Sequence, residues 1–160
     1  MRQTLIAVLV IVFALVGCGG GNETSSTQTD AGPSVEENLR EVRNYVVSEL
    51  WNEGFVDIDS YIKRGTSSTG ETLDIDFTLQ QLDYAMEKKP DYDTFILGLE
   101  DEKYVRVKQV WEKLSPEIDR LYSKVKEEKP TANNNNYDFD VSLFNQYLDA
   151  FIDIVDELNE

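Results

Sequence analysis

Histidine is absent from this chain of 160 residues, and cysteine occurs only once, at Cys18. The lack of histidine excludes Ser-His-Asp and Cys-His catalytic groups, histidine-ligated haem and the Glu-x-x-His pattern of di-iron bundles. With a single cysteine there is also no structural zinc site and no disulfide within one chain. The folded part must therefore be stabilised by its apolar core.

Basic residues are scarce as well. The chain has 15 lysines and arginines against 31 aspartates and glutamates, which gives a formal net charge of −16. A surface this acidic is repelled by phosphodiesters and by anionic lipid headgroups. We therefore expect no nucleic-acid partner, and the acidic charge favours solubility and cationic partners.

An apolar run from Leu5 to Val16 follows the positively charged Arg2. It spans about 18 Å as a helix, which is short of the ~30 Å that a membrane-crossing helix needs. The run ends in Leu15-Val16-Gly17-Cys18. This pattern of a basic start, an apolar core and a small residue before a cut is typical of a secretory signal peptide.

Residues 15 to 18 resemble the lipobox of bacterial lipoprotein precursors. The resemblance implies that the Cys18 thiol receives a diacylglyceryl group, that the chain is cleaved before Cys18, and that palmitate-type acyl chains anchor it to a membrane. Gly19 fits either a Gram-positive cell membrane or a Gram-negative outer membrane, with the protein on the extracytoplasmic face. An ordinary signal peptide cut elsewhere is the alternative, and it would leave Cys18 without a role.

Three segments follow from this interpretation: a lipoprotein signal peptide over 1–17, an acylated cysteine and flexible tether over 18–33, and a folded domain over 34–160. The tether is rich in glycine, serine and threonine and lacks apolar periodicity. A flexible segment of this length reaches about 20 Å. The roughly 125 residues that remain are enough for one core and too few for two domains.

Helix signals begin at Pro33 and Ser34, where Ser34 and Glu37 have the spacing of a capping box. Apolar residues then recur three and four positions apart, and Gly54 is the predicted stop. A short helix is expected within 55–65, starting at Asp57 or Asp59 and ending at Gly65. The apolar residues that define the first helical face are Val35, Leu39, Val42, Val46 and Leu50.

Three further helical regions are predicted. One runs over about 73–89 and ends before Pro90, with a short turn over 91–99. The next runs from about 104 to 128, and its apolar register passes Pro116 unbroken, which favours one kinked helix over two. After an asparagine-rich loop over 131–137, Asp138 or Asp140 caps the last helix. Its apolar face comprises Phe144, Leu148, Phe151, Val155 and Leu158. The sequence thus predicts an all-α fold, an antiparallel bundle of about four helices plus a short extra helix.

Paired carboxylates are the residues most suited to histidine-free chemistry, because two of them can act as acid and base in glycoside hydrolysis. Many of them also lie at predicted helix starts, where they satisfy free amides, and we favour that role. The groups are Asp57 with Asp59, Asp74 with Asp76, the run Glu100 to Glu102, and Asp138 with Asp140. The loop Asn133 to Asn136, with the last of these pairs, is rich in oxygen ligands but lacks the EF-hand spacing for calcium. We predict no catalytic residue, no metal and no cofactor.

Two sets of side chains are candidates for binding. An acidic stripe on the last helix suits a basic protein partner, although a solvated face is the simpler interpretation; it comprises Asp149, Asp153, Asp156 and Glu160. Tyrosines beside carboxylates suit a cation, an amine or a sugar, although bundles also bury many tyrosines. Those outside the apolar faces are Tyr45, Tyr84, Tyr92, Tyr122 and Tyr137.

The function predicted from the sequence is that of a membrane-anchored, non-enzymatic lipoprotein that acts through contacts with an unidentified protein. The alternative is a solute-capturing lipoprotein that binds a cation, amine or sugar in an acidic, tyrosine-lined site. A hydrolase that uses carboxylates alone is a third candidate.

Substitution of Cys18 tests the anchor. We expect Cys18→Ser to leave the chain uncleaved or to release it from membranes, whereas the unsubstituted chain partitions into detergent, because serine cannot form the thioether. The measurement is membrane fractionation with mass spectrometry of the mature N-terminus. A cleaved, serine-bearing protein that stays in the membrane would contradict lipidation at this residue.

Overall fold

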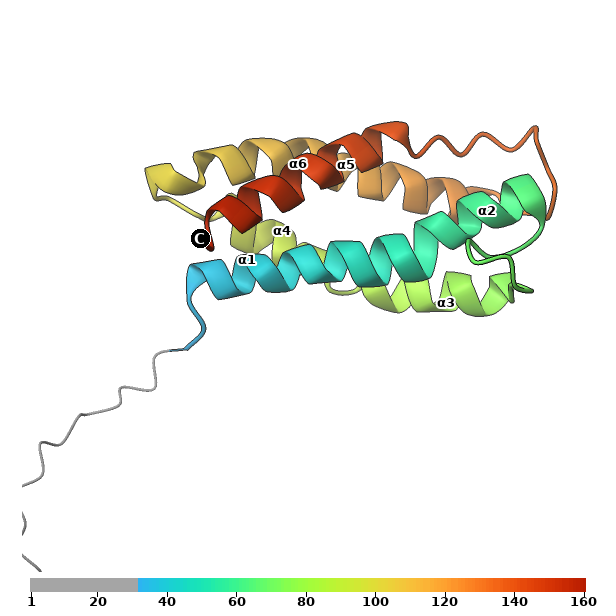
Figure 1. Cartoon of the computed structure of the whole chain (residues 1–160), viewed down its shortest axis with the longest axis horizontal. Helices are drawn as coiled ribbons and strands as arrows, with labels where there is room; N and C mark the ends of the chain where they lie inside the picture. Colours follow the sequence, from blue (N-terminus) through green and yellow to red (C-terminus); the bar gives the residue numbers. More distant parts are fainter. Residues whose placement is uncertain (1–31) are drawn as a thin grey trace, which may run out of the picture. The chain divides into compact units, whose positions relative to one another are not determined.

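Helices are the regular elements of residues 32–160, which are the part of the chain described by this computed structural model (Figure 1). The predictions for the signal peptide, for Cys18 and for the tether up to residue 31 lie outside the described residues. The elements in chain order are α1 (Val35–Asn44), the π-helix η1 (Tyr45–Phe55), α2 (Val56–Arg64), α3 (Ile75–Met86), α4 (Lys89–Leu97), the 3-10 helix η2 (Glu102–Tyr104), α5 (Val105–Glu127) and α6 (Ser142–Glu157).

The elements form an all-α bundle, as predicted. Figure 1 shows α1, η1 and α2 as one long rod, and α3 followed by α4 running back along it. The last two helices, α5 and α6, lie antiparallel to each other and pack closely. Contacts between α3 and η1, α4 and α5, and α1 and α6 close the bundle. None of the helices in residues 32–160 is both long and apolar enough to cross a membrane.

The long rod begins as the capping box predicts. The Ser34 hydroxyl accepts from the Glu37 amide at 3.1 Å, and the Glu37 carboxylate accepts from the Ser34 amide at 2.7 Å. The rod ends at Gly65, whose φ of +76° is the left-handed conformation that glycine adopts without strain. Both ends were therefore correctly predicted.

The predicted stop at Gly54 is wrong, and so is the separate helix start at Asp57 or Asp59. The rod continues through this region because η1 is a π-helix, in which residues five positions apart share a face. Leu50 and Phe55 are five apart, and both are 0 % exposed. Gly54 has a packing role: a Cβ there would lie 3.2 Å from Leu82 Cδ1 of α3.

The connection from α3 to α4 also differs from the prediction. Helix α3 ends at Met86 rather than near Lys89, and Pro90 lies in the first turn of α4. Proline is well placed there because first-turn amides have no partner within the helix. The Asp74 side chain caps α3 by accepting from the Asp76 and Phe77 amides, each at 3.1 Å.

The later helices agree closely with the prediction. Helix α5 is continuous through Pro116, as expected. The N-cap residue of α6 is Val141, which is neither of the two predicted caps, Asp138 and Asp140. The Asp140 carboxylate, one residue earlier, accepts from the Ser142 amide at 2.9 Å. Most of the predicted apolar face of α6 is buried, whereas Leu158 is only partly buried.

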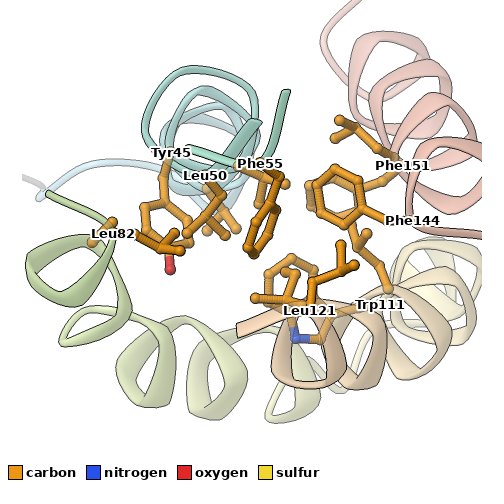
Figure 2. Close-up of a cluster of buried hydrophobic side chains, with 14 of the residues drawn as sticks. Tyr45, Leu50, Phe55, Leu82, Trp111, Leu121, Phe144 and Phe151 are labelled. Carbon is orange, nitrogen blue, oxygen red and sulfur yellow. The ribbon is translucent and has the colours of Figure 1, made fainter. Parts of the chain in front are cut away.

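Aromatic side chains fill much of the interior (Figure 2). Phe144 of α6 lies against Phe55 of η1, edge to face, with 5.4 Å between ring centroids. Trp111 of α5 and Phe151 of α6 have centroids 5.2 Å apart, and both rings are 0 % exposed. The prediction that Trp111 belongs to the core is confirmed. Well-packed aromatic pairs of this kind contribute roughly 0.5–1.5 kcal/mol beyond their burial.

Candidate functional site

The paired carboxylates mainly accept from backbone amides or form ion pairs. Asp57 accepts from the Ser68 amide at 2.7 Å, and Asp59 pairs with Lys63 at 2.8 Å. Hydrogen bonds from Ser142 keep the pKa of Asp140 below its ordinary value, so this carboxyl is a poor proton donor. The capping role that the sequence favours is taken by Asp74, whereas Asp57 and Asp59 lie within the rod and cap no helix.

The asparagine-rich loop uses its own polar groups internally. The Asn133 amide donates to the Tyr61 carbonyl at 3.3 Å, and Asn134 Oδ1 accepts from the Asn136 amide at 3.2 Å. Asp138 and Asp140 do line one hollow of about 450 Å³ together. Within residues 32–160, however, no three acidic side chains gather into a group that could hold a metal ion.

The acidic stripe of α6 lies on the exposed side of that helix. Asp149, Asp153 and Asp156 are exposed on α6, whereas Glu160 is exposed beyond the end of the helix at Glu157 and is not part of its face. Asp156 forms an ion pair with Arg43 of α1, so one member of the stripe also joins α6 to the long rod. Asp149 and Asp153 are in contact with none of the cations in the described part of the chain. Asp149 and Asp153 thus form a solvated acidic face.

Two of the five uncommitted tyrosines come together between α1–η1 and α4. The rings of Tyr45 and Tyr92 have centroids 4.7 Å apart. The Tyr92 hydroxyl donates to Glu41 at 3.1 Å, and Lys88 pairs with Glu49 at 2.7 Å. Burial, and then the hydrogen bond to Glu41, raise the pKa of Tyr92 to about 12.

This tyrosine pair lies at a groove of about 610 Å³. Its charged lining is balanced rather than acidic, which differs from the acidic site that the sequence predicts. The three acids are Glu37, Glu41 and Glu49, and the three bases are Arg40, Arg43 and Lys88. A balanced lining favours a neutral polar solute over a cation or an amine.

A buried polar cluster, which the sequence did not reveal, joins α4 to α5. Lys89 is 5 % exposed, and its ammonium donates to Asp93 at 2.8 Å, Ser115 at 2.7 Å and Asp119 at 3.0 Å. Asp93 also accepts from Trp111 Nε1 at 2.8 Å and from the Ser115 hydroxyl at 2.8 Å. All three ammonium protons are therefore used.

The cluster resembles a serine–lysine pair only in composition. An ammonium that lies between two carboxylates is a charged donor, whereas a serine nucleophile needs a neutral amine to accept its proton. Lys89, Asp93 and Ile96 are spaced four and three apart, which puts the lysine on the buried face of α4. That spacing is the one signal in the sequence that points to the cluster.

The Tyr45 hydroxyl, unlike the polar groups of the Lys89 cluster, is buried without a hydrogen-bond partner in the described part of the chain. Tyr45 is 2 % exposed, and its hydroxyl has no hydrogen-bond partner among residues 32–160. Figure 2 shows the hydroxyl end turned inward, toward the side of the core where Leu82 lies. Burial raises the pKa of this phenol, so Tyr45 stays neutral.

The outer face of α3 is the most exposed aromatic surface in the described residues. Phe77 is 58 % exposed and Tyr84 is 53 % exposed. They lie seven positions apart, with Gln80 and Gln81 between them, so the four side chains share one side of the helix. We call these four residues, Phe77, Gln80, Gln81 and Tyr84, the α3 face.

The α3 face carries almost no charge, in contrast to the rest of this acidic chain. Between Phe77 and Met86 the only aspartate, glutamate, lysine or arginine is Asp83. Lys126 pairs with Asp83 at 3.0 Å, and the Tyr122 hydroxyl donates to it at 2.9 Å. Beside the face, Leu73 and Phe77 line a hollow of about 350 Å³ with two acids, Glu53 of η1 and Asp57 of α2.

Comparison of the chain with protein-family models, with curated proteins and with solved structures finds no match. The candidate sites therefore rest on the geometry of the described residues.

Removal of the Tyr45 hydroxyl tests whether this polar group is unpartnered. We expect Tyr45→Phe to leave the free energy of unfolding unchanged or to raise it by up to about 1 kcal/mol, because an unpaired buried hydroxyl is costly. The matched control is Tyr137→Phe, because the Tyr137 hydroxyl donates to the Lys124 carbonyl at 3.1 Å. That control should lose roughly 0.5–1.5 kcal/mol in urea unfolding. A loss of the same size in Tyr45→Phe would mean that its hydroxyl is bonded in solution.

Proposed function

We propose that this protein is a membrane-anchored, extracytoplasmic lipoprotein that acts without catalysis as a protein-interaction module. The lipobox at residues 15–18 supports the anchor, with either a Gram-positive cell membrane or a Gram-negative outer membrane as the site. The acidic charge of the chain makes nucleic acid an unsuitable partner. The partner is another protein, which is not identified by the sequence.

The observation that carries this proposal is the α3 face. Two half-exposed aromatic rings, separated by amides and almost free of charge, have the composition found at the centre of protein interfaces. Aromatic residues also supply much of the binding energy in such interfaces. The core does not need these rings, because the inner side of α3 is already occupied by Ile75, Leu82 and Ala85.

The acidic stripe is the competing surface on the same domain. It fits a basic partner by charge, but its carboxylates are solvated and one of them is already paired with Arg43. Exposed ion pairs add little affinity, since the median contribution is about 0–1 kcal/mol. The α3 face is therefore the better candidate for the primary contact.

Solute capture is the second candidate function, and the Tyr45–Tyr92 groove is the observation that favours it. Its volume is suited to a small ligand, and its balanced charges favour a neutral polyol or sugar. The carboxylate-only hydrolase has less support, because members of the acid pairs are already bonded to backbone amides.

Site-specific photocrosslinking in cells tests the proposed contact. A benzoylphenylalanine placed at position 77 of the full chain should yield a covalent protein adduct on irradiation, and the adduct should be lost when Tyr84→Asp is added. The same probe at position 153, in the acidic stripe, is the matched control and should yield little.

The opposite pattern, an adduct at position 153 and none at 77, would assign the contact to the acidic stripe. If neither position gives an adduct, while a neutral sugar such as chitohexaose raises the melting temperature of the unsubstituted chain but not of Tyr92→Ala, solute capture is the function.

A further inference from the structure

We propose that the hollow between α3 and the long rod receives an arginine side chain of the partner protein. Leu73 and Phe77 form its apolar wall, and Glu53 and Asp57 supply its acids. We call it the Phe77 hollow. This inference rests on the proposed function, since it names the chemistry that the partner brings to the α3 face.

The Phe77 hollow is continuous with the α3 face. Phe77 is 58 % exposed and belongs to both, so a partner that contacts the α3 face also covers the hollow. The volume of about 350 Å³ is at the lower end of the range for ligand pockets. It therefore suits one long side chain of a docked protein better than a large solute.

The acids of the Phe77 hollow have no basic partner in the described part of the chain. Glu53 is exposed and forms no ion pair with residues 32–160. Asp57 accepts from the Ser68 amide at 2.7 Å, and no lysine or arginine lines this hollow. The Tyr45–Tyr92 groove differs, because three bases balance its acids. A cationic group is therefore the complement of the Phe77 hollow.

Arginine fits this lining better than lysine does. Its planar guanidinium stacks on an aromatic face, which Phe77 offers, and its methylene stem suits an apolar wall. The guanidinium has five N–H donors in a fixed fork, which pairs with carboxylates such as Glu53 and Asp57. The amide oxygens of Asn52 and Gln81, which also line the hollow, are further acceptors. A lysine ammonium has three donors and is more strongly hydrated.

The charges around the α3 face also match a partner with basic residues. Asp74 at the start of α3 and Glu87 just after its end are both exposed acids, whereas Asp83 between them is neutralised by Lys126. The complementary surface is apolar at its centre and basic at its edges. The formal charge of −16 attracts such a partner, and it makes a second copy of this acidic chain unsuitable.

Titration with a defined arginine compound tests this assignment. The full, lipidated chain in phosphatidylcholine nanodiscs is titrated with N-acetylarginine methylamide, and N-acetylcitrulline methylamide is the neutral isostere. We expect the NMR signals of the Asn52 and Gln81 side-chain amides to shift at millimolar arginine compound, as the small size of this probe implies. The citrulline compound should bind about tenfold more weakly, because its hydrogen bonds to the two acids lack the positive charge.

Two matched double variants locate the binding. Glu53→Gln with Asp57→Asn should weaken binding of the arginine compound about tenfold, whereas Asp149→Asn with Asp153→Asn removes the same charge from the acidic stripe and should leave it unchanged. Asparagine at position 57 retains an acceptor for the Ser68 amide. Glu53→Gln alone should weaken binding about threefold, and this substitution removes no ion pair of the described fold.

Equal affinity for the arginine and citrulline compounds would overturn the proposal, and so would an arginine affinity that changes in the acidic-stripe variant alone. If either result is accompanied by a photocrosslinked adduct between position 77 and a different protein, the arginine is wrong and the interaction module stands. If it is accompanied by no adduct at position 77, both proposals are overturned. An adduct between two copies of this chain would overturn the basic partner as well.

Discussion

The five-residue step from Leu50 to Phe55 is the constraint on which the rest of the bundle depends. An α-helical turn would rotate Phe55 away from the face that contains Leu50, but the π-helical turn keeps both side chains in the core. Phe55 then meets Phe144 of α6, and Ile58 and Ile62 of α2 continue the buried face. One rod from Val35 to Arg64 thus packs against the core along its whole length.

The same π segment determines where α3 lies. Gly54 allows Leu82 to approach the backbone of the rod closely, and α3 makes its main contact with η1. The inner side of α3 is buried by this packing. The Lys89 cluster joins the following helix, α4, to α5. The α3 face is left outward on an element whose position is firmly determined. A rigid, precisely placed helix is a suitable platform for contact with a partner, because little conformational entropy is lost on binding.

Local sequence patterns predicted most of the helices, because caps and apolar spacing act over a few residues. Ser34 with Glu37, Gly65, the unbroken register at Pro116 and the apolar face from Phe144 onward all have the expected structure. The prediction failed at Gly54, where a distant helix, rather than local backbone preference, requires glycine. Lys89 was missed because its partners are on α5, and Phe77 because it lies off the apolar stripe of its own helix. The pattern of charges in the sequence pointed to the acidic stripe of α6, whereas the α3 face is notable because its four residues are uncharged.

In the proposed interaction module Phe77 and Tyr84 serve contact rather than folding, and equilibrium unfolding of the double variant Phe77→Ser, Tyr84→Ser tests this most directly. Both rings are more than half exposed, so each buries less than half of the ~150–250 Å² that a whole aromatic side chain buries. At about 25 cal/mol per Å², we predict that the double variant loses no more than about 4 kcal/mol of its free energy of unfolding. A loss of roughly 6–10 kcal/mol, twice the range for removal of one core aromatic side chain, would show that the rings belong to the fold and would contradict the account.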